Sequence, residues 1–322
     1  IFIDLYNDYG STEFLGYQLL ETVSLVKSII INNEKVNKIS KDNEAYLMVN
    51  QTPFYAESGG QLGDTGEIVW TEGKGEITDT QKSSGVYLHK VKITQGVLCV
   101  GDIISMKVDT IRRAGLSANH SATHLLHEAL REVLGNHVVQ KGSMVSSSRL
   151  RFDFSHNKSL TENEKEKIED IVNFRIRECT DVNIQISTRD EAIKKGALAL
   201  FGEKYGNEVR VVSMGANNKS NNKIAWSVEL CGGTHVSNTS DIILFRLLSE
   251  TAVSSGVRRI EAISHKLGFE YLVERDKKLS QISLFLNTTS DKIIDKIKQL
   301  DEEKRKTINE LSIVKRKIIN KD

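Results

Sequence analysis

The chain has 322 residues, more than one hydrophobic core usually organises, so the length predicts two or three domains. Lysine and arginine number 44 against 43 aspartate and glutamate residues, and this net charge of +1 excludes a global field that would attract nucleic acid. A composition of 39% hydrophobic and 27% charged residues excludes wholesale disorder, and no apolar run of about 18 residues exists to span a bilayer.

The three cysteines, Cys99, Cys179 and Cys231, are widely spaced and include no C-x-x-C pair. An odd, dispersed set argues against a disulfide framework and for a reducing compartment. The chain begins at Ile1 without an initiator methionine, and nothing near it is typical of a secretion signal. We therefore expect a soluble, cytoplasmic protein and a piece of a longer chain.

The first part of the chain alternates short apolar runs with glycines from about residue 35 to residue 110. This pattern predicts strands at 45–49, 67–70, 86–93 and 103–108. The glycine turn signals, Gly73 and Gly75 among them, follow one another too closely for parallel βαβ units. We expect a small antiparallel barrel or sandwich over residues 1–111.

The middle part mixes helical and strand patterns, which predicts an α+β domain over residues 112–266. Ser117 can cap a helix that Gly135 ends, and Thr161 with Glu164 forms a capping box for a second helix to about residue 178. Strands are expected at 182–186, 209–211, 224–230 and 242–248, with a short helix near 190–195. The polar stretch 215–223 predicts a surface loop.

The last part, residues 267–322, predicts one or two charged helices after residue 290. Its apolar residues follow a heptad-like row of Ile294, Ile297, Ile308, Leu311 and Ile318. Charged side chains interrupt this row, so a solvated hairpin is favoured over a long coiled-coil homodimer, although oligomerisation through the tail stays open. The fold class expected for the whole chain is α+β: a small antiparallel β-barrel, an α+β domain and a helical tail.

Two histidines and a later Cys–His pair form the most informative chemical pattern. His120 and His124 lie one helical turn apart on one face, and Cys231 and His235 flank a Gly-Gly turn after an apolar run. Imidazole and thiolate are the ligands that zinc prefers, so one Zn²⁺ per chain is predicted. The alternative is that these four are ordinary buried side chains, the interpretation we adopt for the remaining histidines, which are His89, His127, His137, His156 and His265.

A zincin peptidase needs a glutamate directly after the first histidine as general base. Ser121 occupies that position here. The pattern therefore argues against peptide hydrolysis by that mechanism.

Several segments, in one collinear order, resemble the editing region of the alanyl-tRNA synthetase family. The two most specific are TPFYAESGGQ at 52–61 and HSATHLLH at 120–127. The others are QKGS at 140–143, LRFDFSH at 150–156, FGEKY at 201–205, CGGTH at 231–235 and GVRRIEA at 256–262. The resemblance covers about residues 10–265, and the polar stretch 217–223 departs from it as extra loop.

The resemblance implies a β-barrel, then a zinc-dependent editing core, then a helical segment leading to a further domain. It implies that His120, His124, Cys231 and His235 bind the zinc ion. The ATP-dependent synthetase domain would precede residue 1, so ATP is not expected as a cofactor of the residues present. Four protein ligands describe a closed site, so zinc either orients the substrate or has a loose ligand and activates water.

The implied activity is hydrolysis of the ester that joins serine or glycine to tRNA(Ala), sparing alanine. Such a second site is needed because a pocket for alanine cannot exclude glycine and rejects serine only modestly. Thr123 is the candidate for sensing the serine hydroxyl; alternatively, it bonds its own helix carbonyl. Gln140, expected on a turn, is the candidate for positioning water or the terminal adenosine; alternatively, it caps that turn.

Contacts with the tRNA(Ala) acceptor end are expected from basic residues near the core motifs, because guanidinium groups bind phosphates well. The candidates are Arg112, Arg113, Lys141, Arg149, Arg151, Arg258 and Arg259. The Gly59-Gly60-Gln61 tripeptide is better explained as a glycine-rich turn than as a peptide-release motif.

Two other functions remain open from the sequence. One is a free-standing trans-editing deacylase of the same superfamily, which the start of the chain and the long helical tail disfavour. The other is a zinc-stabilised RNA-binding module without catalysis.

Overall fold

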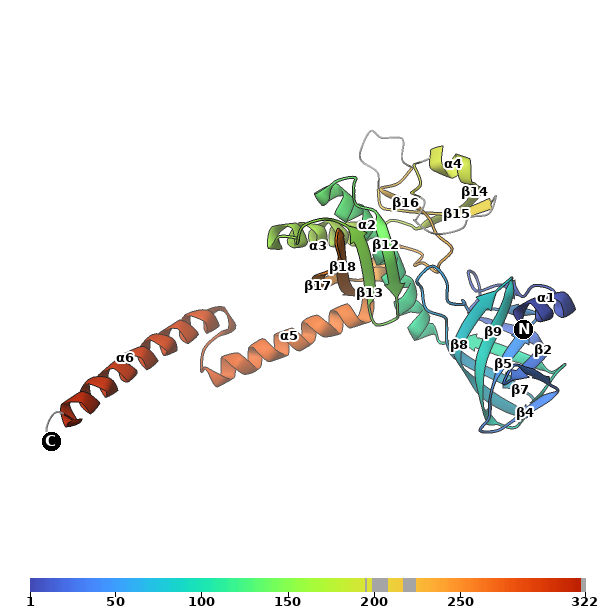
Figure 1. Cartoon of the computed structure of the whole chain (residues 1–322), viewed down its shortest axis with the longest axis horizontal. Coiled ribbons are helices and arrows are strands. Elements are labelled where there is room, and N and C mark those ends of the chain that lie inside the picture. The colour runs from blue at the N-terminus through green and yellow to red at the C-terminus, as the bar shows by residue number, and fades with distance from the viewer. Residues whose placement is uncertain (195, 199–207, 217–223, 320–322) are drawn as a thin grey trace. The chain divides into compact units, whose positions relative to one another are not determined.

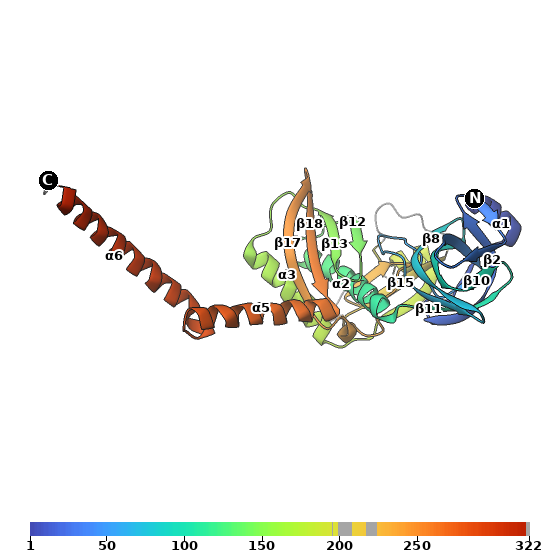
Figure 2. The ribbon, with the colours of Figure 1, turned by 90° about the horizontal axis from the view of Figure 1, so that it is seen from below.

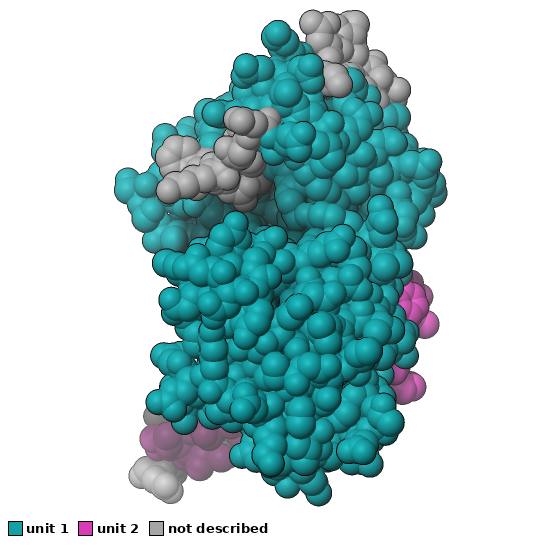
Figure 3. Space-filling model, turned by 90° about the vertical axis from the view of Figure 1, so that its right-hand side faces the viewer, with its two compact units in different colours: residues 1–268 teal, residues 269–322 magenta. Residues whose placement is uncertain are grey.

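The computed structural model of the chain describes residues 1–194, 196–198, 208–216 and 224–319. These residues separate into two compact units, Ile1–Gly268 and Phe269–Asp322 (Figure 3). The expected segments 201–205 and 217–223 lie outside the described residues.

The first part of the larger unit is a closed antiparallel barrel, which confirms the predicted all-β architecture (Figure 1). A pairing between its first and last strands closes the barrel. In spatial order the strands are β11 (Ile103–Val108), β7 (Gly66–Trp70), β8 (Gly73–Ser83), β9 (Val86–Gln95), β5 (Glu44–Val49) and β2 (Glu21–Ile31). Small elements complete it: α1 (Phe2–Tyr9), β1 (Glu13–Phe14), β3 (Glu34–Val36), β4 (Lys38–Ser40), β6 (Gln51–Thr52) and β10 (Val97–Cys99).

Alternating apolar residues fill the barrel interior, as the strand period requires. Ile68, Ile77, Val91 and Ile104 are fully buried in its core. The sequence pattern missed β2 and β8. Gly73 is the first residue of β8 and follows the turn at residues 71–72 that joins β7 to β8, so the turn signal there holds to within a residue. A Cβ atom on Gly73 would come within 2.4 Å of the Trp70 ring, so this glycine makes room for the tryptophan, whereas Gly75 lies inside β8.

The second part of this unit is a four-stranded antiparallel sheet with two helices against it (Figures 1 and 2). Its strands, in spatial order, are β12 (Gln140–Val145), β13 (Leu150–Ser155), β18 (Val257–Ser264) and β17 (Phe245–Ser254), and its helices are α2 (Thr110–Leu134) and α3 (Glu162–Arg177). Phe152, Phe154 and Leu126 are fully buried in the shared core. The capping box of Thr161 and Glu164 is confirmed.

Helix α2 starts earlier than predicted. Asp109 caps it by accepting from the backbone N–H of Arg112, and Ser117 lies buried in its interior. The first turns carry polar residues that bond the barrel, so the apolar period from which the start was inferred begins only later. Gly135 ends the helix as predicted.

A small three-stranded sheet consists of β14 (Asn183–Thr188), β15 (Glu208–Met214) and β16 (Ser227–Leu230), and α4 (Arg189–Lys194) packs against β14 and β15. Its strand β16 is shorter than the predicted 224–230. The strand predicted at 242–248 begins at Phe245, because Asn238 caps a 3₁₀ turn over Thr239–Ile242.

The smaller unit is helical, as predicted. It contains most of α5 (His265–Phe285), the 3₁₀ turn Ser290–Lys292 and α6 (Ile293–Ile319). The predicted apolar row of α6 is exposed, with Ile308 57% and Leu311 50% accessible. Among the described residues, no helix combines the length and apolarity that crossing a membrane requires.

Candidate metal centre

The structure brings His120, His124, Cys231 and His235 together. Their ligand atoms all lie within 4.8 Å of one another. Two of the histidines approach the thiol of Cys231. Nε2 of His120 lies 3.4 Å and Nε2 of His235 lies 3.3 Å from Cys231 Sγ. Helix α2 supplies the first two residues, and the loop after β16 supplies the others.

The nitrogen atoms that face away from the cluster are each held by another side chain. Nδ1 of His120 lies 2.7 Å from Oε1 of Gln61, Nδ1 of His124 2.5 Å from Oε2 of Glu229, and Nδ1 of His235 3.1 Å from Oγ of Ser121. The acceptor oxygens of Gln61 and Glu229 at Nδ1 leave the Nε2 lone pairs of neutral His120 and His124 directed into the cluster. Nε2 of His124 is buried and has no hydrogen-bond partner in the structure, as expected of an atom that ligates an ion.

Burial and neighbouring charges shift the pKa values of the side chains in and around the cluster in different directions. Burial opposes ionisation of Glu229, but His124 and His127 outweigh it and hold the pKa of that carboxyl well below its usual value. Burial likewise opposes a charged His124, yet Glu229 and Cys231 raise its pKa to about 10. Burial lowers the pKa of His235 to about 3, which keeps this imidazole neutral. Three imidazoles and one thiol of this kind fit a zinc ion.

The Gly-Gly turn allows the loop to approach the helix. A Cβ atom on Gly233 would lie 2.0 Å from Cε1 of His120, so a side chain is excluded there. The guanidinium of Arg210 donates to the carbonyls of Cys231 at 3.0 Å and Gly233 at 2.8 Å, and the Tyr17 hydroxyl donates to Gly232 O at 2.6 Å. These bonds fix the backbone that carries the two later ligands.

A pocket of about 240 Å³ opens beside the cluster. It is lined by Tyr55, Ser58, Gly59, His120, Thr123, His124, Gln140, Ser143, Cys231, Gly232 and Gly233. The volume suits a small group rather than a drug-sized ligand. A larger hollow of about 520 Å³ on the barrel contains no histidine or cysteine in its lining, so the smaller pocket is the candidate site.

Comparisons with known proteins find matches in both parts of the larger unit. Residues 209–261 match the family described as threonyl and alanyl tRNA synthetase second additional domain, and residues 3–112 match class II (A) tRNA synthetases. Alanine–tRNA ligases from Dinoroseobacter shibae and Sinorhizobium medicae are 45% and 46% identical to this chain over 99% of its length. The chain belongs to the alanyl-tRNA synthetase family. It spans about 36% of the length of these relatives.

The chain contains the editing region of the alanyl-tRNA synthetase family. The segment that matches the second additional domain includes Glu229, Cys231 and His235. The family resemblance inferred from the sequence motifs is therefore confirmed.

Thr123 and Gln140, the two residues expected to act on the substrate, both line the pocket. The Thr123 hydroxyl donates to its own helix carbonyl, Asn119 O, at 2.8 Å, which is the alternative role considered for it. The hydroxyl oxygen keeps the capacity to accept a hydrogen bond. Gln140 is the first residue of β12 rather than part of a turn, and its amide donates to Ser143 Oγ at 3.2 Å.

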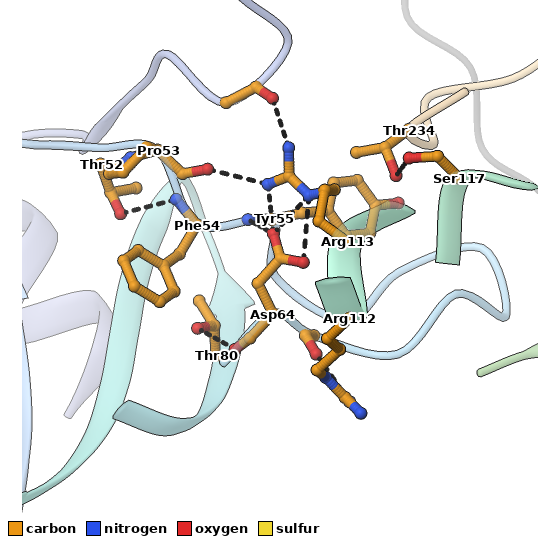
Figure 4. A network of polar contacts seen from close by, with 12 residues as sticks. Thr52, Pro53, Phe54, Tyr55, Asp64, Thr80, Arg112, Arg113, Ser117 and Thr234 are labelled. Atoms are coloured by element: carbon orange, nitrogen blue, oxygen red, sulfur yellow. Dashed lines mark hydrogen bonds and ion pairs between the residues drawn. The ribbon is translucent and has the colours of Figure 1, made fainter. Parts of the chain in front are cut away.

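Arg113 is buried and bound within the protein, which argues against the RNA contact expected for it. Its guanidinium pairs with Asp64 and donates to the carbonyls of Gly16 and Pro53 (Figure 4). Its neighbour Arg112 is half-buried and donates to Gly63 O at 3.1 Å. Because Arg113 has no accessible charge, we do not carry it into the functional proposal.

The other basic candidates lie on β12, β13 and β18 or beside them. Arg259 forms a two-point contact with Asp153, with both N–O distances at 2.7 Å, and Arg258 pairs with Glu250. Arg149 lies 3.6 Å from Glu261 and is exposed, as is Lys141. Arg151 is half-buried. The charges of Arg258 and Arg259 are thus partly compensated within the sheet.

Sequence reasoning missed two residues that support the centre. Glu229 lies inside an apolar strand and holds both His124 and His127, the latter at 2.7 Å. An acidic residue within an apolar run is a detectable signal, because such residues are rarely buried without a partner. Gln61 lies in the predicted glycine-rich turn, and from there its side chain reaches His120, which the sequence did not indicate.

Proposed function

We propose that this chain hydrolyses the ester of mischarged seryl- or glycyl-tRNA(Ala) and spares alanyl-tRNA(Ala). The observation that carries the proposal is the His3Cys cluster opening on a small pocket lined by polar side chains. Membership of the family supports tRNA as the partner, and the match to the second additional domain supports editing as the activity.

His120, His124, Cys231 and His235 would hold one zinc ion. A bound zinc ion supplies electrophilic assistance to the ester or orients it. The protein's own contribution is to fix these ligands through Gln61, Glu229 and Ser121, so that the ester meets a rigid site.

Thr123 supplies the means to distinguish serine from alanine. Because its proton is donated to Asn119 O, its oxygen can only accept, and a serine hydroxyl in the pocket would donate to it. An alanine methyl in the same place would leave that oxygen buried and unpaired, which disfavours binding by about 1–3 kcal/mol. Glycine leaves space for a water molecule to satisfy the oxygen instead.

Gln140, the first residue of β12, also lines the pocket. Its amide can bond both a water molecule and the terminal ribose or base of the acceptor end. Gln140 would hold either the attacking water or the terminal adenosine in position. Its place in the pocket lining supports this role.

The acceptor strand would contact the basic residues that are exposed or half-buried. Arg112, Lys141, Arg149 and Arg151 are the candidates, with smaller contributions from Arg258 and Arg259. Contacts of this kind bind phosphate without reading sequence.

A deacylation assay tests the proposal. The zinc-loaded chain is incubated with seryl-, glycyl- and alanyl-tRNA(Ala), and the remaining ester is measured over time. We expect serine and glycine to be released well above the buffer background and alanine to be retained. Loss of serine no faster than in buffer contradicts the proposal and favours a zinc-stabilised RNA-binding module without catalysis.

A further inference from the structure

The side chain of Gln61 is fully buried. It connects the segment between β6 and β7, which we call the barrel side of the protein, to the metal centre. It lies between β6 and β7, far in sequence from both the helix and the loop that carry the cluster. Gln61 is not one of the four proposed metal ligands. Its side chain nevertheless bonds His120 on α2 and Thr234 on the loop after β16.

The backbone around Gln61 is held firmly. Ser58 and Gln61 exchange two backbone hydrogen bonds of 3.1 and 3.0 Å across a tight turn, in which Gly59 and Gly60 have φ angles of 59° and 82°. The turn is attached to the end of β12, because Val145 N donates to Gly60 O at 2.7 Å and Leu62 N donates to Val145 O at 3.0 Å. The Gly59-Gly60-Gln61 tripeptide is therefore a fixed turn, and it places the Gln61 side chain next to His120.

The orientation of the Gln61 amide follows from an unambiguous donor. The backbone N–H of Thr234 lies 3.0 Å from Oε1 of Gln61, and a backbone N–H can only donate. The atom facing it must therefore be the oxygen, which leaves Nε2 to donate to Thr234 Oγ1 at 2.9 Å. Ser117 of α2 completes this contact by donating to the same Thr234 hydroxyl at 3.0 Å (Figure 4).

This orientation determines the tautomer of His120. The same Oε1 atom lies 2.7 Å from Nδ1 of His120, and an amide oxygen can only accept, so Nδ1 carries the proton. Nε2 of His120 is then left with its lone pair directed at the cluster, 3.4 Å from Cys231 Sγ. The side-chain amide of Gln61 thus fixes the tautomer of His120 on α2. It also holds the loop that carries Cys231 and His235.

We propose that Gln61 is a positioning residue of the cation site, which fixes His120 as the Nδ1–H tautomer and ties it to the Thr234 loop. The barrel side of the protein thereby becomes part of the editing centre. This inference deepens the proposed function and rests on the cation site assigned there.

The zinc affinity of variants of the whole 322-residue chain tests the proposal. Gln61→Leu removes the acceptor for His120 and Thr234, whereas Gln61→Glu keeps acceptor oxygens in the same place. Gln81→Leu is the matched control, because Gln81 lies on the barrel strand β8 and its side-chain amide donates to Glu57 and Asp79. Competition with a chromogenic chelator measures the dissociation constant, and the visible spectrum of the cobalt-substituted protein reports the ligand geometry.

We expect Gln61→Leu to weaken zinc binding about 10- to 100-fold, the usual effect of losing a partner that orients a metal ligand. Gln61→Glu should restore affinity to within a fewfold of the wild type, and Gln81→Leu should leave it unchanged. Equal affinity in Gln61→Leu and Gln81→Leu would overturn the proposal, as would equal weakening in Gln61→Leu and Gln61→Glu.

The tautomer is also measurable in the wild-type chain, which covers the case that Gln61→Leu fails to fold. Nitrogen-15 NMR of labelled histidines distinguishes Nδ1–H from Nε2–H. We expect Nδ1–H for His120 in zinc-free protein, and Nε2–H would overturn the proposal. Neither measurement uses deacylation, so a chain that binds zinc but spares seryl-tRNA(Ala) contradicts the proposed function alone.

Discussion

Arg113 and Asp64 form a buried ion pair that joins the first turns of α2 to the segment before β7. Nε of Arg113 lies 2.9 and 3.1 Å from the two carboxylate oxygens, and the side chains are 7% and 1% exposed. Asp64 also accepts from the backbone N–H of Tyr55 at 2.7 Å. Each polar atom of the two side chains thus has at least one hydrogen-bond partner within the protein, which anchors the helix that carries two of the cluster's histidines (Figure 4).

Arg113→Met should lower the free energy of unfolding by about 3–5 kcal/mol, because it leaves the Asp64 carboxylate buried without its partner. Arg149→Met is the control, since Arg149 is exposed and its ion pair with Glu261 is expected to contribute less than about 1 kcal/mol. Urea unfolding followed by circular dichroism measures both. Equal losses in the two variants would contradict a structural role for Arg113.

Cys231→Ala should remove zinc and deacylation together. Losing a thiolate ligand weakens binding by more than the roughly 10- to 100-fold that follows loss of an orienting partner. Cys179→Ala, at an exposed cysteine away from the cluster, should retain both. Metal content after gel filtration and the seryl-tRNA(Ala) assay provide the two readouts, and a Cys231→Ala protein that keeps its metal and full activity would refute the ligand assignment.

Thr123→Val should reduce the preference for seryl over alanyl esters about tenfold or more, because the substitution keeps the shape but removes the acceptor for a serine hydroxyl. Thr94→Val is a matched control, since Thr94 also donates to a backbone carbonyl, at 3.0 Å, but lies on the barrel surface. The ratio of the two deacylation rates is the measurement. If the ratio is the same in both variants, Thr123 does not sense the hydroxyl.

The barrel should lose stability in acid through His89. Burial lowers the pKa of His89 to about 4, and its Nε2 and Nδ1 atoms lie 2.8 Å from Thr52 Oγ1 and 3.2 Å from Leu47 O. The unfolded chain binds the proton with a pKa near 6.5, so the stability from neutral His89 is complete above that pH. It falls by about 1.4 kcal/mol per pH unit as the pH drops toward 4.

His89→Gln removes this titration and should flatten the dependence in that range. Urea unfolding of both proteins at pH 4.5–7 with a chelator present makes the comparison, because the chelator removes any effect of metal release. Parallel curves for the two proteins would show that His89 does not titrate as the burial requires.

Much of the fold follows from local pattern. The spacing of apolar residues predicted β5, β7, β9 and β11, and the Thr161 capping box predicted α3, because side-chain period and cap chemistry act within a few residues. The start of α2 and strand β8 were missed. In both places a residue contacts a partner far along the chain: Ser117 bonds Thr234, and a Cβ atom on Gly73 would lie 2.3 Å from the backbone oxygen of Gln95 in the neighbouring strand β9.

The four residues of the cluster were recognisable because each pair is local and chemically distinctive: two histidines one helical turn apart, and a cysteine and a histidine around a Gly-Gly turn. Their partners were not. Gln61 and Glu229 resemble ordinary turn and strand residues until folding brings them to His120 and His124. The same is true of the basic residues. The sequence shows that Arg113 is charged, but not that it is buried in an ion pair with Asp64.

The sequence by itself determined the family, the fold class and the set of potential ligands, since these depend on residue type and on short spacings along the chain. Only the tertiary structure decided which nitrogen of each histidine faces the cluster, which arginines keep an accessible charge, and that a residue of the barrel side reaches the centre. Most of those properties depend on contacts between segments far apart in the sequence, such as Gln61 and His120, whose positions differ by 59, and no local pattern records them.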